Sequence, residues 1–512
     1  MCLKFIILFL NFFFVADSYK ILALFPHPGK SHVDVFLPLT KALALRGHEI
    51  TVVSHFPLPT PIPKYTDVRL GDDTTPLVNI LDIDNYQERR VRKWLEPYLL
   101  HQIAQHSCEI GYQSKSLRDF LKRNEAFDLI IAEFFNSNCL LGLVHKFKAP
   151  LIGISSSTIM HWINERFGNP SHPAYIPNNL MDFSDELSFF ERIENLLVGL
   201  VHQVFFTYYA SRNDEQIARK YLGEDLPLIK NVIMNSSLLL VNTHFSLNLP
   251  RPLVPGIVEV GGIHINKIKT LPKDLEKWIN ESTHGVIYFS LGSMIKGHTF
   301  PDEKRSEFLK AFGRLPQRVL WKWENETMSG KPDNVMIQKW MPQLDILCHP
   351  NVKAFISHGG LLGTTEAVHC GVPVVVMPQY GDQFTNARAL EANGGGVILH
   401  LSEATEEKIH DALRTILDPQ FQKQAKELSA RFRDRPLPPL ETAIYWVEYV
   451  ARHRGAHHMR TAAVDMPLYK YLLLDVIAFL LLVAGLVFAL FFYVTRAVFR
   501  KLFTKRDKQK TN

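Results

Sequence analysis

The stretch His358-Gly359-Gly360 has the residue types of a site for an anionic group. The apolar stretch Phe355–Ser357 before it ends a predicted strand, and helical spacing follows as far as Val368. Such a strand–helix turn presents the backbone N–H groups of a helix N-terminus, and glycine lets a ligand approach them closely. The histidine can donate a further hydrogen bond to a phosphate oxygen. We therefore predict that this turn binds a diphosphate.

Two histidines in another loop could act as a general base. The loop FPHPGKSH follows the apolar stretch Tyr19–Leu24 and contains His27 and His32. The ordinary pKa of histidine, about 6.5, suits the removal of a proton from an attacking hydroxyl group at neutral pH. The residue types alone leave both histidines open as candidates.

Three motifs that would indicate other chemistry are incomplete. Gly29-Lys30-Ser31 resembles the end of a P-loop, but position 24 is leucine, and His48-Glu49 lacks the second histidine of a zinc motif because position 52 is valine. The glycines of 359–363 do not form the dinucleotide fingerprint, and the five cysteines contain no CxxC pair. We expect neither a metal nor a cofactor.

Alternating apolar stretches and helical stretches predict two doubly wound α/β domains. In the first half, strands are expected at 19–24, 50–53, 127–132, 150–154 and 238–242, with helices at 35–46 and 136–145. In the second half, strands are expected at 285–291, 319–323, 335–337, 352–356 and 372–376. The segment Asn248–Gly262 is rich in proline and glycine and is the expected linker. We predict an N-terminal domain at 19–250 and a C-terminal domain at 251–455, with ligands bound beyond the carboxyl ends of the strands.

Both ends of the chain carry membrane signals. Residues 1–18 combine Lys4, about a dozen apolar residues and a small-x-small site, which is typical of a cleaved signal peptide, although an uncleaved anchor is the alternative. Residues 472–494 are almost wholly apolar and long enough to span a bilayer as a helix. The basic tail 495–512 follows, and by the positive-inside rule it is cytosolic. We predict a single-pass type I protein whose two domains are lumenal.

The charge distribution excludes a nucleic-acid partner. Residues 496–512 hold seven Lys/Arg and one Asp, which accounts for the whole net charge of +6. The rest of the chain is near neutral and has no large basic patch. With 46% apolar and 21% charged residues, the chain is also not an intrinsically disordered one.

Further short motifs concern sorting and modification. The N-x-S/T sequons at Asn235, Asn280 and Asn325 are candidate N-glycosylation sites, consistent with a secretory lumen. Lys508 and Lys510 stand fifth and third from the end, and they resemble a dilysine signal read by a coat protein for retrieval to the endoplasmic reticulum. A solvated basic tail is the alternative.

Residues 187–209 form another apolar segment, interrupted by Glu191, Arg192 and Glu194. These charges argue against a spanning helix. We expect an amphipathic helix packed on the domain, with a helix on the membrane surface near a lipophilic acceptor site as the alternative.

The window from Trp340 to Gln383 closely resembles the signature of the UDP-glycosyltransferase family. It reads WMPQLDILCHPNVKAFISHGGLLGTTEAVHCGVPVVVMPQYGDQ. The signal peptide, the two halves, the apolar span and the basic tail are similar to those of membrane-anchored animal members, of the arthropod type, along the whole chain. The resemblance implies the GT-B fold, in which two Rossmann-like domains face a cleft, and residence in the endoplasmic reticulum membrane.

The resemblance also implies roles for residues of the C-terminal half. Trp340 would stack on uracil, Gln343 would bond the nucleoside, and Glu366 would accept the ribose hydroxyls. The remaining candidates are Ser290, Ser293, His358 and Gly360 for the diphosphate, and Asp382 and Gln383 for the donor sugar. One position departs from the pattern, because many relatives have asparagine where this chain has Leu362. That difference leaves the choice of donor sugar open.

For catalysis, the family's histidine matches His32 rather than His27. The family's supporting aspartate corresponds to Glu133, a carboxylate that is one methylene longer, at the end of FDLIIAEFF. Asp128 precedes the strand and should be too distant. The implied reaction is an inverting transfer of a hexose, with glucose favoured over glucuronic acid, from a UDP-sugar to a hydroxyl of a small lipophilic acceptor. Detoxification and hormone or pigment conjugation are reactions of this kind.

Two alternatives remain at the level of sequence. A non-catalytic small-molecule-binding homologue would keep the fold, although the retained His32 and donor motif argue against it. A glycosyltransferase acting on lipid acceptors is not excluded, because acceptor residues have no readable signature. The sequence also leaves the oligomeric state open.

Overall fold

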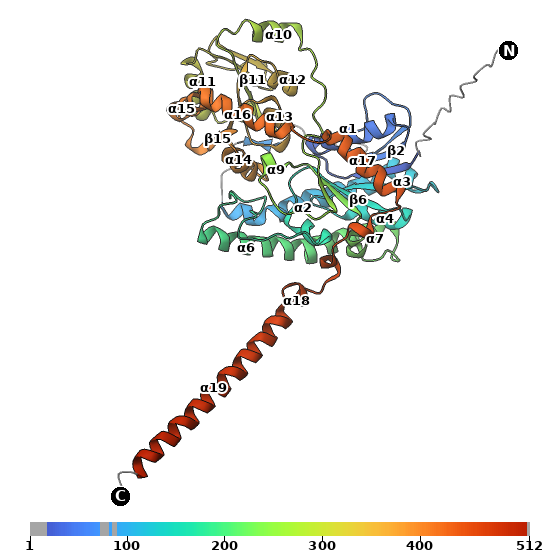
Figure 1. The fold of residues 1–512 in the computed structure, drawn as a ribbon. Coiled ribbons are helices and arrows are strands. Elements are labelled where there is room, and N and C mark those ends of the chain that lie inside the picture. The colour runs from blue at the N-terminus through green and yellow to red at the C-terminus, as the bar shows by residue number, and fades with distance from the viewer. Residues whose placement is uncertain (1–17, 72–80, 84–89, 509–512) are drawn as a thin grey trace, which may run out of the picture. The chain divides into compact units, whose positions relative to one another are not determined.

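A computed structural model describes residues 18–71, 81–83 and 90–508 (Figure 1). The chain divides into a larger unit, Met1–Arg460, and a smaller one, Thr461–Asn512. Except for its last residue, the expected signal peptide lies outside the described residues, and so does Lys510.

The first sheet of the larger unit has seven parallel strands in the order β3-β2-β1-β5-β6-β7-β8. The strands are β1 (Lys20–Phe25), β2 (Glu49–Ser54), β3 (Tyr65–Arg69), β5 (Leu129–Glu133), β6 (Leu151–Ser155), β7 (Leu238–Val241) and β8 (Ile257–Glu259). Alternate residues of β1 pack into different cores, Leu22 and Leu24 into one and Ile21 and Ala23 into the other. Burial on both faces explains why this strand is continuously apolar.

Helices enclose this sheet on its two faces. They are α1 (Lys30–Leu45), α2 (Arg90–Gln113), α3 (Lys115–Leu121), α4 (Gly142–Phe147), α5 (Asn164–Phe167), α6 (Phe189–Val204), α7 (Ser211–Leu222) and α8 (Ile229–Met234). The short helix α9 (Phe245–Asn248) instead packs on the second half of the unit, where Leu247 joins the core. A 3₁₀ turn, η2 (Cys139–Leu141), precedes α4, and a π-helical turn, η4 (Phe205–Ala210), joins α6 to α7. The sheet order reverses between β1 and β5, so a crevice is expected beyond their carboxyl ends.

The second sheet has six parallel strands in the order β12-β11-β9-β13-β14-β15. They are β9 (Val286–Ser290), β11 (Arg318–Lys322), β12 (Val335–Gln338), β13 (Val352–Ser357), β14 (Val374–Val376) and β15 (Gly396–Ile398). Its helices are α10 (Lys273–Asn280), α11 (Asp302–Gly313), α12 (Gln343–Leu347), α13 (Leu361–Cys370), α14 (Gln383–Ala392), α15 (Glu406–Leu417) and α16 (Pro419–Arg433). Its order reverses between β9 and β13, the strands that carry Ser290 and precede His358.

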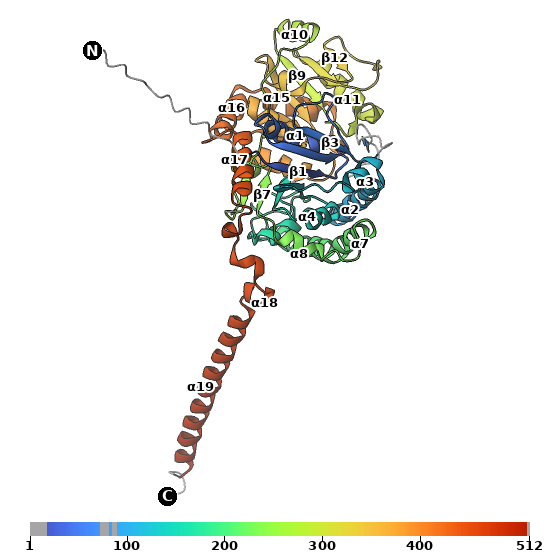
Figure 2. The same cartoon turned by 90° about the vertical axis from the view of Figure 1, so that its right-hand side faces the viewer.

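The two halves of the larger unit exchange elements. Strand β8 follows the expected boundary at residue 250 yet pairs with β7 of the first sheet. Helix α17 (Pro439–Arg452) packs Ile444 and Val447 into the same core as α1 and β2, and it lies beside α1 in Figure 2. A short strand pair, β4 (Leu81–Asp82) with β10 (Ile295–Lys296), adds a further link.

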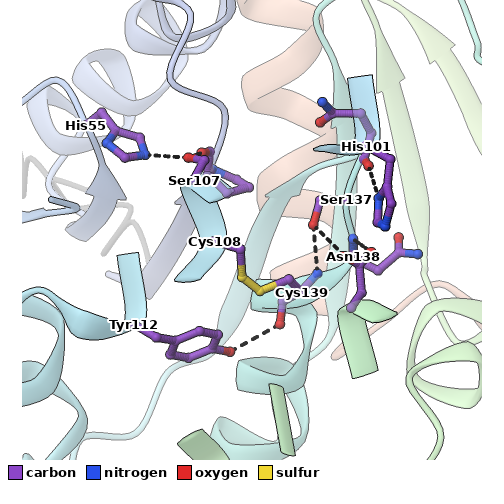
Figure 3. Close-up of a disulfide and its surroundings, with 11 residues drawn as sticks. His55, His101, Ser107, Cys108, Tyr112, Ser137, Asn138 and Cys139 are labelled. Carbon is purple, nitrogen blue, oxygen red and sulfur yellow. Dashed lines mark hydrogen bonds between the residues drawn. A yellow bond between two sulfur atoms is a disulfide. The ribbon is translucent and has the colours of Figure 1, made fainter. Parts of the chain in front are cut away.

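Two disulfides cross-link helical segments in the larger unit. Cys108 of α2 is bonded to Cys139 of η2, and Figure 3 shows the Tyr112 hydroxyl donating to the Cys139 carbonyl at 3.1 Å. Cys348, which follows α12, is bonded to Cys370, the last residue of α13. The Cα–Cα distances of 6.4 and 4.7 Å lie in the usual disulfide range.

The smaller unit consists of short turns followed by a long helix. Helix α18 (Leu468–Tyr471) precedes α19 (Leu474–Lys508). Within α19, Leu474–Leu502 is long and apolar enough to cross a membrane. Helix α19 therefore begins two residues after the start of the expected span 472–494, and it continues beyond the end of that span into the basic tail.

Candidate active site

A cavity of about 610 Å³ lies between the two halves of the larger unit. Its walls come from α1, α2 and the loops after β5 and β6 on one side, and from the loops after β9, β13 and β14 on the other. It therefore occupies the carboxyl-end crevices of both sheets, where α/β folds bind ligands. All the sequence-predicted site residues line it except Glu133, which lies directly behind His32.

His32 and Glu133 are brought together although 101 positions separate them. His32 lies in the first turn of α1, rather than in the preceding loop, and Glu133 is the last residue of β5. Their Nδ1 and Oε1 atoms are 2.5 Å apart, and the Ser156 hydroxyl is 2.9 Å from the same Nδ1. Because Nδ1 is occupied, Nε2 is the ring nitrogen that can meet a ligand.

The second histidine of the loop supports the first. The His27 ring stacks on the His32 ring with centroids 3.7 Å apart, and its Nδ1 accepts the Gly29 N–H at 3.0 Å. A Cβ at Gly29 would lie 2.8 Å from the His27 ring, so the close approach requires glycine there. His27 thus fixes the loop and packs against His32.

Burial governs the electrostatics of this group. It raises the pKa of Glu133 to about 7, with His27 and Ser156 opposing that shift, and it lowers the pKa of His32. A buried pair with one net negative charge takes up a proton readily, since the protonated pair is neutral. In the form that carries one proton fewer, the remaining proton lies between Nδ1 and Oε1. Only this form leaves the lone pair of Nε2 free to accept a proton.

The opposite wall is built around the start of α13. His358 directly follows β13 and packs so closely on Gly292 and Gly360 that a Cβ on either glycine would lie within 2.6 Å of its ring. No described side chain caps the helix, whose N-cap residue is Gly360. The first N–H groups of α13 are therefore available to an anion. Burial, with Lys322 second, lowers the pKa of His358 to about 4, so its imidazole is neutral at pH 7.

Trp340, Gln343 and Glu366 form a second group on this wall. The Trp340 ring is exposed, and the Gln343 amide donates to Glu366 Oε2 at 2.6 Å. Burial raises the pKa of Glu366 to about 7, and the Gln343 hydrogen bond opposes that shift. The structure thus places a flat aromatic face and a hydrogen-bonded carboxylate on the lining of the same cavity.

Asp382 and Gln383 lie at the start of α14. Asp382 Oδ2 accepts from Asn386 at 3.2 Å, and burial raises its pKa to about 6. Gln383 Oε1 accepts the backbone N–H groups of Gln379 and Tyr380 at 2.9 and 3.2 Å. Its amide nitrogen is therefore the group best placed to meet a ligand. Ser290 Oγ, at the end of β9, accepts the Gly292 N–H at 3.3 Å, and Ser293 follows on the cavity wall.

Two cavity residues were missed at the level of sequence. Ser156, in the serine run after β6, contacts His32, and Lys322 at the end of β11 lies with its Nζ 5.7 Å from the Trp340 ring centroid. Lys322 also donates to the Gly292 carbonyl at 2.8 Å and to Glu324 at 3.1 Å. Their positions at carboxyl ends of strands were the available signal, but neither has a distinctive motif.

The structure also places Leu362, the position that differs from the family pattern, and the three sequons. Leu362 lines the cavity and packs against the core of the first domain, so it contributes to contact between the halves. Asn235, Asn280 and Asn325 are all exposed, as glycosylation requires. Among the described residues, no group of three or more His, Cys, Asp or Glu side chains could hold a metal ion.

Comparison with known proteins decides the family. The profile of the family described as "UDP-glucoronosyl and UDP-glucosyl transferase" matches residues 75–509. The chain belongs to this family. It is 43% identical over 496 residues to "UDP-glycosyltransferase UGT5" of Dactylopius coccus, covering 96% of this chain and 94% of that one. It is 33% identical over 510 residues to the human "UDP-glucuronosyltransferase 1A8", covering 97% and 94%.

The expected fold is confirmed as well. A solved glycosyltransferase, titled "Crystal Structure Analysis of the Glycotransferase of kitacinnamycin", superposes with a TM-score of 0.56 over 85% of this chain and 99% of that one. The sequence identity is 15%, so this likeness concerns the GT-B fold alone. The enzymatic class rests on the family instead: as one of its members, the chain is a UDP-glycosyltransferase, an enzyme that transfers glucose or glucuronic acid from a UDP-sugar.

Proposed function

We propose that the enzyme transfers a hexose, with glucose favoured, from a UDP-sugar to a hydroxyl of a small lipophilic acceptor with inversion at the anomeric carbon. One observation carries this proposal. His32, which is hydrogen-bonded to Ser156 and to Glu133 behind it, and the uncapped start of α13 line opposite walls of one cavity. A base and an anion site that face each other are what a direct displacement requires.

The donor is proposed to bind along the second wall. Uracil stacks on Trp340, and the ribose hydroxyls donate to Glu366, which Gln343 orients. The diphosphate lies at the start of α13, where the N–H groups and the neutral His358 ring can donate hydrogen bonds and the Lys322 ammonium can offset negative charge. Asp382 and the amide of Gln383 meet the sugar hydroxyls.

In the chemical step the acceptor oxygen attacks the anomeric carbon from the face opposite UDP. The new bond from carbon to the acceptor oxygen forms as the bond to the diphosphate breaks, and UDP leaves with the electron pair. The hydroxyl proton moves to His32 Nε2. Glu133 and Ser156 stabilise the resulting imidazolium through Nδ1.

The preference for a lipophilic acceptor rests on the wall beside His32. Its side chains are largely apolar: Leu37, Leu99, Leu100, Ile103, Phe135 and Met160. Such a surface favours the binding of apolar molecules and carries few polar groups that would need a matched partner.

The test combines stereochemistry with mutation. An α-linked UDP-glucose should give a β-glucoside, which proton NMR of the product distinguishes. His32→Ala should lower kcat by about 10² or more, the usual contribution of a general base, with an unchanged Kd for UDP. His27→Ala is the matched control and should retain more activity. A product with retained configuration would overturn the assignment. So would a His32→Ala variant that stays active while His27→Ala loses its activity.

The location is proposed to be the endoplasmic reticulum membrane, with the larger unit in the lumen. Both disulfides are of the kind formed in an oxidising compartment, and basic residues follow the apolar part of α19. Protease added to sealed microsomes should remove only a short tail. Digestion of the bulk of the chain would contradict this orientation.

The dilysine signal is tested separately. Changing Lys508 and Lys510 to serine should let part of the protein reach the Golgi and acquire mature glycans on Asn235, Asn280 or Asn325. Unchanged residence would reject the retrieval signal and leave the orientation intact.

A further inference from the structure

The polarity of α6 is reversed relative to that of a helix on a water-soluble protein. Its outward residues are apolar at spacings of three and four, and the stripe continues through η4. Phe190 is 78% exposed and Leu200 is 53% exposed. We call this surface the α6 face, formed by Phe190, Ile193, Leu197, Leu200, Val204 and Tyr208. A contiguous exposed apolar stripe of this kind marks a surface that meets something other than water.

The buried side of α6 fixes this orientation. Asn195 is 3% exposed, donates to the Pro173 and Ile176 carbonyls at 2.9 Å, and accepts the Asn178 N–H at 2.8 Å. His202 is 1% exposed and is 3.1 Å from the Asn178 amide. Rolling the helix to hide its apolar stripe would leave these buried polar groups without partners, at a cost of about 1–3 kcal/mol each. The α6 face therefore stays outward.

Helix α2 extends the apolar surface to the cavity. It lies beside α6 at the edge of the larger unit (Figure 1), and its exposed Tyr98 ring lies 6.0 Å from Phe205 and 6.4 Å from Tyr209. Leu99 and Ile103 are exposed and also line the cavity wall. The apolar surface thus continues from α6 across α2 to the space in front of His32.

The chain itself identifies the occupant. It carries its own candidate membrane span, Leu474–Leu502, and only thirteen residues lie between Arg460 and Leu474. A linker of that length reaches about 45 Å at most, which keeps lipid at a high effective concentration around the larger unit. Aromatic rings stand at both ends of the stripe, Phe189 and Phe190 at one and Tyr208 and Tyr209 at the other, and such rings favour the membrane–water interface.

We propose that the α6 face docks on the surface of the bilayer that anchors the chain, with its apolar side chains in the interfacial layer. An acceptor dissolved in lipid then reaches the cavity along α2 without crossing water. This second statement rests on the proposed function, whereas the docking itself does not.

Docking is tested on the full chain in phosphatidylcholine nanodiscs. The four described cysteines are paired in disulfides, and Cys2 lies in the expected signal peptide, so a single introduced cysteine can be labelled. A nitrobenzoxadiazole label on Leu200→Cys should be quenched by lipids carrying a doxyl group on the acyl chain. The control is Leu45→Cys at the end of α1, where the leucine is 77% exposed. Quenching at position 200 should exceed that at position 45 several-fold.

Equal quenching at the two positions would overturn docking on lipid. A second copy of the chain is the other occupant that the test recognises. It would give no lipid quenching at position 200 in discs holding one chain, together with label-to-label quenching in discs holding two. That result also overturns the proposal.

The supply of acceptor is tested by kinetics. The double variant Leu200→Glu/Val204→Glu should raise the KM for a lipid-partitioned phenol about fivefold or more in nanodiscs. The KM values for UDP-sugar and for a water-soluble phenol should not change, and Leu45→Glu should leave all three unchanged. An unaltered KM for the lipid-partitioned phenol would overturn the supply route. Absence of transfer in every variant would count against the proposed function, while the quenching result still decides docking.

Discussion

The two walls of the cavity are organised in different ways. On the wall of the first domain the ionisable groups bond to one another, as His32 does with Glu133 and Ser156. On the wall of the second domain several groups are held open toward the cavity, including the exposed Trp340 ring and the uncapped start of α13. A closed network suits proton transfer, whose partners must be positioned before the ligand arrives. An open set suits the binding of a charged molecule. Mutations on the first wall should therefore change turnover, and mutations on the second should change affinity.

The carboxylate behind the base should give the largest separation of these effects. Glu133→Gln removes the negative charge that stabilises the His32 imidazolium in the proposed mechanism, and it can present the wrong hydrogen-bonding atom to Nδ1. We expect kcat to fall by about 10³, with an unchanged Kd for UDP by calorimetry. Glu133→Asp, which keeps a carboxylate at this position, should lose far less. A large loss of UDP affinity in Glu133→Gln would contradict the division between the walls.

The nucleotide-binding group should show the opposite pattern. Trp340→Ala and Glu366→Ala should each weaken UDP binding about 10- to 100-fold, since base stacking and hydrogen bonds to charged groups contribute about 1–3 kcal/mol. With saturating donor, kcat should change little. Trp340→Phe and Glu366→Gln are the matched controls and should bind more tightly than the alanine variants. Wild-type affinity in both alanine variants would reject this donor site.

The pH dependence distinguishes a coupled pair from a lone histidine. The proposed mechanism requires the form of the pair that carries one proton fewer, and burial raises the pKa of Glu133 to about 7. The value of kcat/KM should therefore rise with pH and level off above about 7. In Glu133→Gln the buried His32 stands alone with a lowered pKa, so the residual activity should persist at least one pH unit lower. Identical acid limbs in the two proteins would show that the pair does not titrate as a unit.

Ser156 should give the smallest effect. Its hydroxyl shares Nδ1 with Glu133, and loss of one neutral hydrogen bond costs about 1 kcal/mol. Ser156→Ala should lower kcat about fivefold, measured beside Ser157→Ala as the neighbouring control. A loss as large as that of Glu133→Gln would mean that the serine holds the histidine in place.

Much of the second wall could be predicted because its residues lie close together in the sequence. Trp340 to Gln383 is one window, and its candidate residues follow a strand or begin a helix there, except Glu366, which lies within α13. The parallel strands were also readable, since burial on both faces makes them continuously apolar. The structure brings the predicted His32 and Glu133 together through the order of the first sheet, in which β1 and β5 are neighbours.

Other features depended on tertiary contacts that a linear pattern does not record. Lys322 and Ser156 reach the cavity only because their strands end there. The segment 187–209 was expected to form an amphipathic helix packed on the domain. Helix α6 does pack on the domain, but Asn195 and His202 lie on its buried side together with Val198, and Asn195 donates to the carbonyls of Pro173 and Ile176. Strand β8 was missed because its three residues lie within a proline- and glycine-rich stretch.

The return of α17 to the first domain limits how this enzyme can be recombined with its relatives. A chimera that exchanged only residues 19–250 would pair a foreign α1 with the resident α17, whose Ile444 and Val447 share one core with it. The hydrogen bond between His48 and Glu448 would be mismatched as well. An exchangeable acceptor module is therefore discontinuous in the gene, and a crossover design that carries residues 439–456 along with the N-terminal segment preserves the packed helix pair.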